Sequence, residues 1–255
     1  MPKSGLNREN NLHLTRLTVA ASIFSPPTSA SAAGPMAILA PKALLPRDAS
    51  AIYAEVARFG FTSLQTVPGG VQIASEDGVS VLALTGTGWQ FTEDLSQSGG
   101  FEPAISKIDV AIRAFLEKLP PNTVMLNQTV DLQATWENLG AQADEHIENR
   151  FLKPQARKIV SDIENLEFNG AGLRLNLTRP IGDLPPGVQP LPGGPPMVET
   201  FDVRVEPYFA DKSKLFLEVT GVLAPTQDLS RVIQGARFVE KVLWEHVAGN
   251  IAMED

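Results

Sequence analysis

The sequence contains no cysteine. This absence excludes disulfides, thiolate metal sites, iron–sulfur clusters and cysteine nucleophiles in a single step. Histidine is scarce as well: His13, His146 and His246 stand alone, without a second histidine or a carboxylate at a recognised metal-ligand spacing. We therefore expect no bound metal and no other cofactor.

Basic residues are too few and too scattered for a nucleic-acid surface. The chain has 21 Lys and Arg against 29 Asp and Glu, which gives a net charge of −8. This charge opposes a phosphate backbone, and no run of basic residues interleaved with aromatics offsets it locally. No stretch approaches the roughly 18 to 20 consecutive apolar residues of a membrane span. We predict a cytoplasmic protein whose partners are not nucleic acids.

Residues 1–35 differ in composition from the rest of the chain. They are rich in Ser, Ala, Asn and Pro, and their basic residues outnumber their acids. We predict a disordered tail. Two alternatives remain: a signal peptide with the apolar region Leu17–Phe24 and a cleavage site near residues 30–32, which would make the protein exported, or a natural start at Met36.

From residue 36 to residue 255 the pattern predicts a single domain without an internal sequence repeat. Predicted helices follow Asp48, cover Glu102–Leu119 and about 139–151, and run from Asp228 to about Ala248. Alternating apolar residues between turn signals predict strands at Met36–Ala40, Phe61–Val67, Val71–Ser75, Val79–Thr85, Trp89–Thr92, Val124–Leu132, Leu166–Thr178, Thr200–Pro207 and Lys214–Leu223.

Most of the predicted strands are joined by connections too short for a crossover helix. This favours an α+β fold with a mainly antiparallel sheet. We expect the helices to pack on one face of the sheet and the other face to be polar. One connection differs: the loop 180–198 carries seven prolines and four glycines between Pro180 and Pro196. It is interpreted either as a projecting arm that grips a partner or covers a site, or as a tolerated surface insertion.

The predicted polar face comes from strand alternation, because every second residue of a strand points to the same side. Arginines, carboxylates and amides fall together at these positions. Such a face is a platform for a polar ligand or a second protomer, or alternatively a solvated surface with cross-strand ion pairs. The candidate binding residues are Asn127, Asp131, Arg174, Asn176, Arg204, Glu206 and Glu218.

The last predicted helix carries a second candidate surface. Its core stripe is expected to include Leu229, Ala236 and Leu243, which places Phe238 and Val242 on the opposite side. An aromatic residue at that position indicates either a contact within the fold or an interface with a partner.

The segments Asn122–Leu132 and Phe201–Leu223, followed by a helix through Trp244, resemble in their order a sporadically distributed family of uncharacterised bacterial proteins. The likeness spans residues 37–250. It departs at residues 126–129, where Leu-Asn-Gln-Thr replaces an arginine- and tyrosine-bearing segment. The resemblance implies a bacterial protein and no established activity.

Known catalytic motifs are absent: there is no Gly-x-Ser-x-Gly elbow, and no glycine-rich loop leads into a helix. The first hypothesis is a non-catalytic binding or assembly module, homo-oligomeric, acting through the polar face and the proline-rich arm. The rival is a hydrolase or transferase with Asp131 and Glu206 as the acid–base pair and Arg174 and Arg204 as anion holders.

Overall fold

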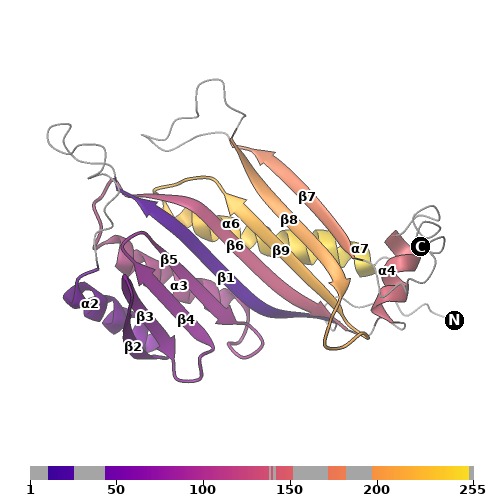
Figure 1. Cartoon of the computed structure of the whole chain (residues 1–255), viewed down its shortest axis with the longest axis horizontal. Helices are drawn as coiled ribbons and strands as arrows, with labels where there is room; N and C mark the ends of the chain where they lie inside the picture. The colour runs from indigo at the N-terminus through magenta and orange to yellow at the C-terminus, as the bar shows by residue number, and fades with distance from the viewer. Residues whose placement is uncertain are drawn as a thin grey trace.

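The computed structural model describes residues 11–25, 44–137, 139, 142–151, 172–181 and 197–252. Within these residues the chain forms nine strands in one antiparallel sheet, in the order β2-β3-β4-β5-β1-β6-β9-β8-β7 (Figure 1). The strands are β1 (Leu12–Phe24), β2 (Phe61–Val67), β3 (Gly70–Ser75), β4 (Ser80–Thr85), β5 (Gly88–Asp94), β6 (Val124–Trp136), β7 (Leu173–Pro180), β8 (Val198–Pro207) and β9 (Leu215–Leu223). The predicted α+β class with an antiparallel sheet is confirmed.

The helices lie between the strand runs and after the last strand. None of those in the described parts of the chain combines the length and the apolar character that crossing a membrane requires. They are α2 (Pro46–Val56), η2 (Ala57–Phe59), α3 (Phe101–Leu116), α4 (Ala143–Phe151), α6 (Leu229–Lys241), the π-helical turn η3 (Val242–Val247) and α7 (Ala248–Ala252).

The prediction of a disordered tail over residues 1–35 is wrong for β1, which is a central strand of the sheet. Leu17, Val19 and Ala21 are buried, and β1 pairs with β5 on one side and with β6 on the other. A signal peptide cleaved near residue 32, or a start at Met36, would remove this strand. The strand is stabilised by the burial of its alternate apolar side chains, which composition alone does not reveal.

The order of elements repeats although the sequence does not. The first half runs β1, α2, a meander of β2 to β5, then α3; the second runs β6, α4, a meander of β7 to β9, then α6. In each half the first strand lies at the centre and the meander starts at the outer edge. The antiparallel pair β1–β6 joins the halves, in a register that spans Leu12 to Trp136 and Phe24 to Val124.

The core lies between the strands and the helices. In Figure 1, α3 and α6 pass behind the strands. Contacts join α6 to β6 and β9, α3 to β1, and α2 to β2. The approach of α6 to β9 depends on Gly235, because a Cβ atom there would lie 2.1 Å from Leu223 Cδ1.

The last helix is rotated relative to the predicted stripe, and this overturns part of the predicted interface. Val232 and Val239 join Leu229 and Ala236 in the core, and Val242 is buried as well. Phe238 packs on Phe201 of β8, with ring centroids 5.1 Å apart. Val242 is therefore not available to a partner, and Phe238 makes a contact within the fold.

Other predictions differ at element ends. Helix α2 begins at Pro46 and has no side-chain cap, so Asp48 lies in its first turn. The last helix begins where it was predicted, and its N-cap is Asp228, whose carboxylate accepts a hydrogen bond from Ser230 N. The predicted strand Met36–Ala40 and most of the loop 180–198 lie outside the described residues.

Candidate binding site on the strands

The strand register lines up polar side chains across the sheet in two cross-strand rows. Residues directly opposite one another on neighbouring antiparallel strands point to the same side. The arginine row consists of Asp94, Arg16, Gln133, Glu218, Arg204 and Arg174, on β5, β1, β6, β9, β8 and β7. The aspartate row, two residues further along each strand, consists of Thr92, Thr18, Asp131, Thr220, Asp202 and Asn176.

On β7, β8 and β9 the charges of these rows are paired. Arg174 makes three hydrogen bonds to the Asp202 carboxylate, the shortest 2.6 Å, which raise the pKa of Arg174 and lower that of Asp202. Arg204 donates to Glu218 at 2.9 Å and to Glu206 at 3.3 Å, and the bond to Glu218 raises its pKa. Both arginines therefore already hold carboxylates, which weakens the hypothesis that they hold an anion of a substrate.

Asp131 is the acid of the aspartate row whose pKa is raised. Its carboxylate accepts hydrogen bonds from Thr220 Oγ1 at 3.2 Å and from Gln133 Nε2 at 3.1 Å. Burial raises the pKa of Asp131, and the nearby charge of Glu218 raises it further, while Arg16 acts in the opposite direction. Asp131 thus retains a proton to higher pH than an exposed aspartate.

Asp131 and Glu206 do not form a carboxylate pair. Asp131 lies opposite Thr220, whose partner on β8 is Asp202, whereas Glu206 lies opposite Phe216, whose partner on β6 is Thr135. The two acids are therefore two strands and four residues apart, about 16 Å at the usual strand spacing and rise. Glycosidase carboxylates that act together are about 5 to 9.5 Å apart, so this arrangement does not support the predicted acid–base pair.

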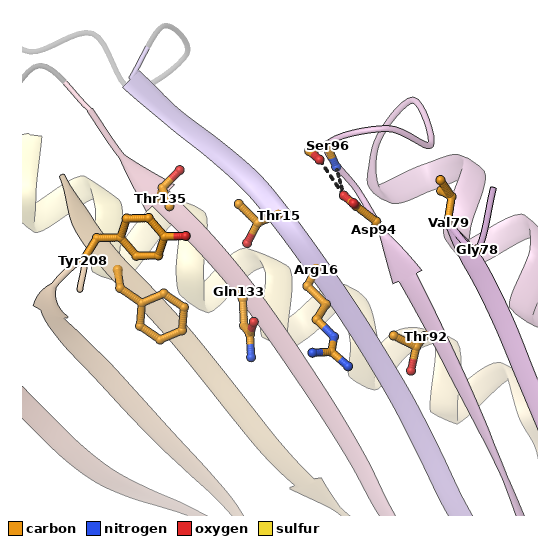
Figure 2. Close-up of a pocket in the computed structure, with 11 residues that line it drawn as sticks. Thr15, Arg16, Gly78, Val79, Thr92, Asp94, Ser96, Gln133, Thr135 and Tyr208 are labelled. Atoms are coloured by element: carbon orange, nitrogen blue, oxygen red, sulfur yellow. Dashed lines mark hydrogen bonds between the residues drawn. The ribbon is translucent and has the colours of Figure 1, made fainter. Parts of the chain in front are cut away.

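A hollow of about 450 Å³ opens where β5, β1 and β6 meet (Figure 2). We call it the first hollow. Its volume falls within the range of small-molecule sites, about 300 to 1,000 Å³. Hydroxyl groups predominate among the polar side chains, and one arginine supplies the positive charge. The lining residues are Thr15, Arg16, Gly78, Val79, Thr92, Asp94, Ser96, Gln133, Thr135, Tyr208 and Phe216.

Arg16 is the cation of the first hollow. Among the residues that the structure describes, no carboxylate lies within the 4.0 Å ion-pair distance of its guanidinium. In Figure 2 the guanidinium points away from Asp94 and extends between Gln133 and Thr92. An exposed arginine that points into a hollow without a carboxylate partner is free to take an anion.

Asp94, directly opposite Arg16, is held by the turn that follows β5. Its Oδ1 accepts hydrogen bonds from Ser96 N at 3.0 Å and from Ser96 Oγ at 2.5 Å, and its Oδ2 accepts one from Gln97 Nε2 at 2.7 Å. The hydrogen bond from the Ser96 side chain is the main cause of the lowered pKa of Asp94. Asp94 therefore remains a carboxylate while it is turned away from Arg16.

A β-bulge at Thr15 shapes the first hollow. The pairing of β1 with β6 shifts by one residue between Leu14, opposite Ala134, and Arg16, opposite Gln133. The extra residue breaks the alternation along β1, and Thr15 and Arg16 both line the hollow. Bulges commonly re-aim side chains in this way.

A second hollow of about 410 Å³ lies further along β1 and β5, lined in part by Ala20, Ala83, Gln90 and Thr129. The side chains of Ala20 and Ala83 are small, and they leave space for this hollow above the strands. Asn127 also lines this hollow, with a positive φ of 46° that few residues other than glycine and asparagine adopt. We call it the second hollow.

The predicted site residues are therefore brought together only in part. Arg174, Arg204 and Glu218 share the arginine row, Asp131 and Asn176 share the aspartate row, Glu206 lies beyond them, and Asn127 lies at the second hollow. The sequence analysis missed Arg16, Gln133 and Tyr208. The apolar spacing Leu17, Val19, Ala21 was the signal that could have placed Arg16 on a strand.

In the described stretches of the chain, no three His, Asp or Glu side chains gather as a metal ion would require. Chemically the site offers hydrogen bonds and one free positive charge. No protein-family model matches the chain, and no curated protein is significantly similar to it.

Proposed function

We propose that this protein is a non-catalytic binding module, and that it holds a small polar ligand on the side of the strands that carries the arginine and aspartate rows. In this proposal the helices pack only on the side of the sheet opposite to these rows. Its support is the alternation of burial: along β9, Leu215, Leu217 and Val219 are buried, whereas Phe216, Glu218 and Thr220 are partly exposed. The contacts of α6 with β6 and β9 are consistent with that division.

The observation that carries this proposal is the free guanidinium of Arg16 in a hollow of about 450 Å³. A charged group without a partner is stabilised by a ligand of opposite charge, and the surrounding hydroxyl and amide groups can fix the orientation of that ligand. Gln133 is itself oriented, because its Nε2 donates to Glu218 at 2.9 Å as well as to Asp131. Such preorganisation lowers the cost of binding.

The rival hypothesis of a hydrolase or transferase has less support. Arg174 and Arg204 are engaged by carboxylates, and Asp131 and Glu206 are far apart. Asp131 alone supplies one acid with a raised pKa. A proton donor without a nucleophile or a second catalytic group beside it gives binding chemistry and no complete reaction.

Nuclear magnetic resonance provides the test. The isotopically labelled chain is titrated with pooled polar metabolites, and shifted amide resonances are mapped on the fold. We expect the shifts to cluster on β1, β5 and β6. The matched control is the groove of about 410 Å³ between α3 and α6, lined by Ile105, Asp109, Ile233 and Arg237. Shifts confined to that groove, or no shifts from any pool, would contradict the proposal.

Assembly with a second copy is a further candidate function, favoured by β7 at the edge of the sheet. Leu175 and Leu177 are 42% and 46% exposed, and an apolar edge strand of this kind is a template for pairing with another chain. We expect light scattering to show an oligomer that the double variant L175K/L177K dissociates. A strict monomer at high concentration would remove this candidate and leave ligand binding untouched.

A further inference from the structure

Arg16 and Asp94 form an unusual pair, because they lie directly opposite each other on β1 and β5 without bonding. Opposite residues of antiparallel strands have Cα atoms about 4.5 to 5.5 Å apart, and opposite charges there normally attract. Elsewhere in the sheet they do: Arg204 bonds to the directly opposite Glu218.

The separation has a structural cause. Ser96 and Gln97 turn the Asp94 carboxylate toward the loop after β5, whereas Arg16 extends toward Gln133 (Figure 2). The first hollow therefore presents a positive and a negative group that do not neutralise each other. Asp94 Oδ2 accepts one hydrogen bond, from Gln97. Because a carboxylate has about four acceptor positions, Asp94 can accept another donor.

The charges around the first hollow select against ligands of high negative charge. Asp94, Asp131 and Glu218 all lie in the arginine and aspartate rows close to Arg16. A phosphate dianion placed on Arg16 would be repelled by these carboxylates. A ligand without net charge, which carries one anionic and one cationic group, avoids this repulsion.

One wall of the first hollow is aromatic. Phe216 and Tyr208 line it, and both side chains are partly exposed. Phe216 is the only aromatic side chain that β9 contributes, and it faces the side occupied otherwise by Glu218 and Thr220. A partly exposed ring among polar residues provides an apolar contact for the side chain of a ligand.

We propose that the first hollow binds a free α-amino acid with an aromatic or large apolar side chain, its carboxylate on Arg16, its ammonium on Asp94 and its side chain against Phe216 and Tyr208. This inference rests on the proposed function of the sheet as a binding surface. The two charges of an α-amino acid are separated by one carbon, which suits partners on neighbouring strands. The planar guanidinium of Arg16 can donate two parallel hydrogen bonds to the carboxylate.

The experiment uses three probes that differ in one charge at a time. L-Phenylalanine carries both charges, 3-phenylpropanoate lacks the ammonium, and phenethylamine lacks the carboxylate. Binding to the full chain is measured by calorimetry and by amide shifts. We expect phenylalanine to bind at least tenfold more tightly than either single-charge probe, with shifts on β1 and β5.

Three variants test the residue assignments. We expect R16Q and D94N each to weaken phenylalanine binding at least tenfold, while R237Q, which removes an arginine of α6 that is paired with Glu102, changes it less than twofold. Circular dichroism establishes that each variant is folded. In D94N the side-chain oxygen still accepts both hydrogen bonds from Ser96, and only the bond from Gln97 is lost.

The outcomes separate the two proposals. Equal binding of phenylalanine and 3-phenylpropanoate, or unchanged binding by R16Q or D94N, overturns the amino-acid assignment and leaves a binding sheet intact. Absence of phenylalanine binding, with pooled metabolites still shifting β1 and β5, has the same meaning. Only if no polar ligand shifts these strands does the proposed function fail too.

Discussion

The two halves of the sheet treat their arginines differently. On β7, β8 and β9, Arg174 and Arg204 are bonded to carboxylates of neighbouring strands, whereas on β1 Arg16 remains free beside a carboxylate that a turn holds away. In the residues that the structure describes, both halves run strand, helix, meander, helix, with four strands in the first meander and three in the second. The same scaffold therefore supports a charge network that is complete in one half and open in the other.

This difference indicates where a ligand can gain energy. A ligand placed on the paired half must compete with existing ion pairs, and the gain is small because each broken pair has to be replaced. A ligand placed on Arg16 breaks no ion pair among the described residues. Substitutions in the strand pair β1–β6, and then in each half of the sheet, test this comparison.

The largest effect is expected from the strand that joins the halves. Val19 is fully buried and lies between Phe91 on β5 and Val130 on β6. The substitution V19K places a charge in the core without a partner, so we expect a loss of more than about 4 kcal/mol of unfolding free energy, or no folded protein. Urea unfolding followed by circular dichroism measures this.

Ser22, exposed on the same strand, provides the matched control. We expect S22K to unfold within about 0.5 kcal/mol of the unsubstituted chain, as surface substitutions usually do. If V19K were as stable as S22K, β1 would not be a central strand, and the prediction of a disordered tail would be restored for residues 12–24.

Strand β1 also shows which parts of the fold could be predicted from the sequence and which could not. The meander β2 to β5, helix α3 and the hairpin β8–β9 were predicted because turn residues and apolar periodicity coincide there. In β1 the bulge at Thr15 shifts the alternation, so Leu12 and Leu17 are both buried although five residues apart. Buried residues five apart do not fit the period of two that predicts a strand.

For the candidate site, the sequence predicted only which side of each strand carries polar residues. Alternation predicted that Asp131, Arg174 and Arg204 lie on one side of their strands, because period two is a local property. The pairing of Arg174 with Asp202 and the freedom of Arg16 depend on the strand order, which brings β1 next to β5 and β6. That order arises from long-range packing, and no local pattern specifies it.

A second large loss of stability is expected where α3 packs on the first half of the sheet. Lys107 of α3 donates to Glu93 Oε1 at 2.5 Å and to Ser80 Oγ at 2.8 Å, and the Glu93 side chain is fully buried. We expect K107M to cost about 3 to 5 kcal/mol of unfolding free energy, because it leaves a buried carboxylate without its cation. Chemical denaturation gives the value.

The double variant E93Q/K107M is the control for this ion pair. It removes the charge together with its partner, so we expect it to recover most of the stability lost in K107M. A double variant as unstable as K107M would mean that Lys107 contributes through packing of its aliphatic chain rather than through the ion pair.

A smaller effect is expected in the paired half. The Arg204 side chain is 41% exposed, so solvent screens its bonds to Glu218 and Glu206. We expect R204Q to cost about 1 kcal/mol or less, decreasing as salt is added, and R174Q to cost less than R204Q. Urea unfolding at low and high salt distinguishes this result from a loss of packing, which salt would not reduce.

The smallest effect concerns the pH dependence of stability at Asp131. Its pKa in the folded chain is raised above the ordinary value of 3.8. At pH values between 3.8 and this raised pKa, the folded state holds a proton that the unfolded state has lost. The unfolding free energy therefore falls as the pH rises through this window. We expect D131N to remove that fall, and so to equal the unsubstituted chain near pH 3 and to match or exceed its stability at pH 7.

Asp202 supplies the control of opposite sign, because Arg174 lowers its pKa below 3.8. Its contribution to stability is present above the unfolded value and is lost as the pH falls through the folded one. We expect D202N to be less stable than the unsubstituted chain at pH 7 and to approach it in acid. If D131N and D202N changed stability in the same direction at pH 7, burial of Asp131 would not dominate its hydrogen bonds to Thr220 and Gln133, and the acid would belong to the paired half of the network.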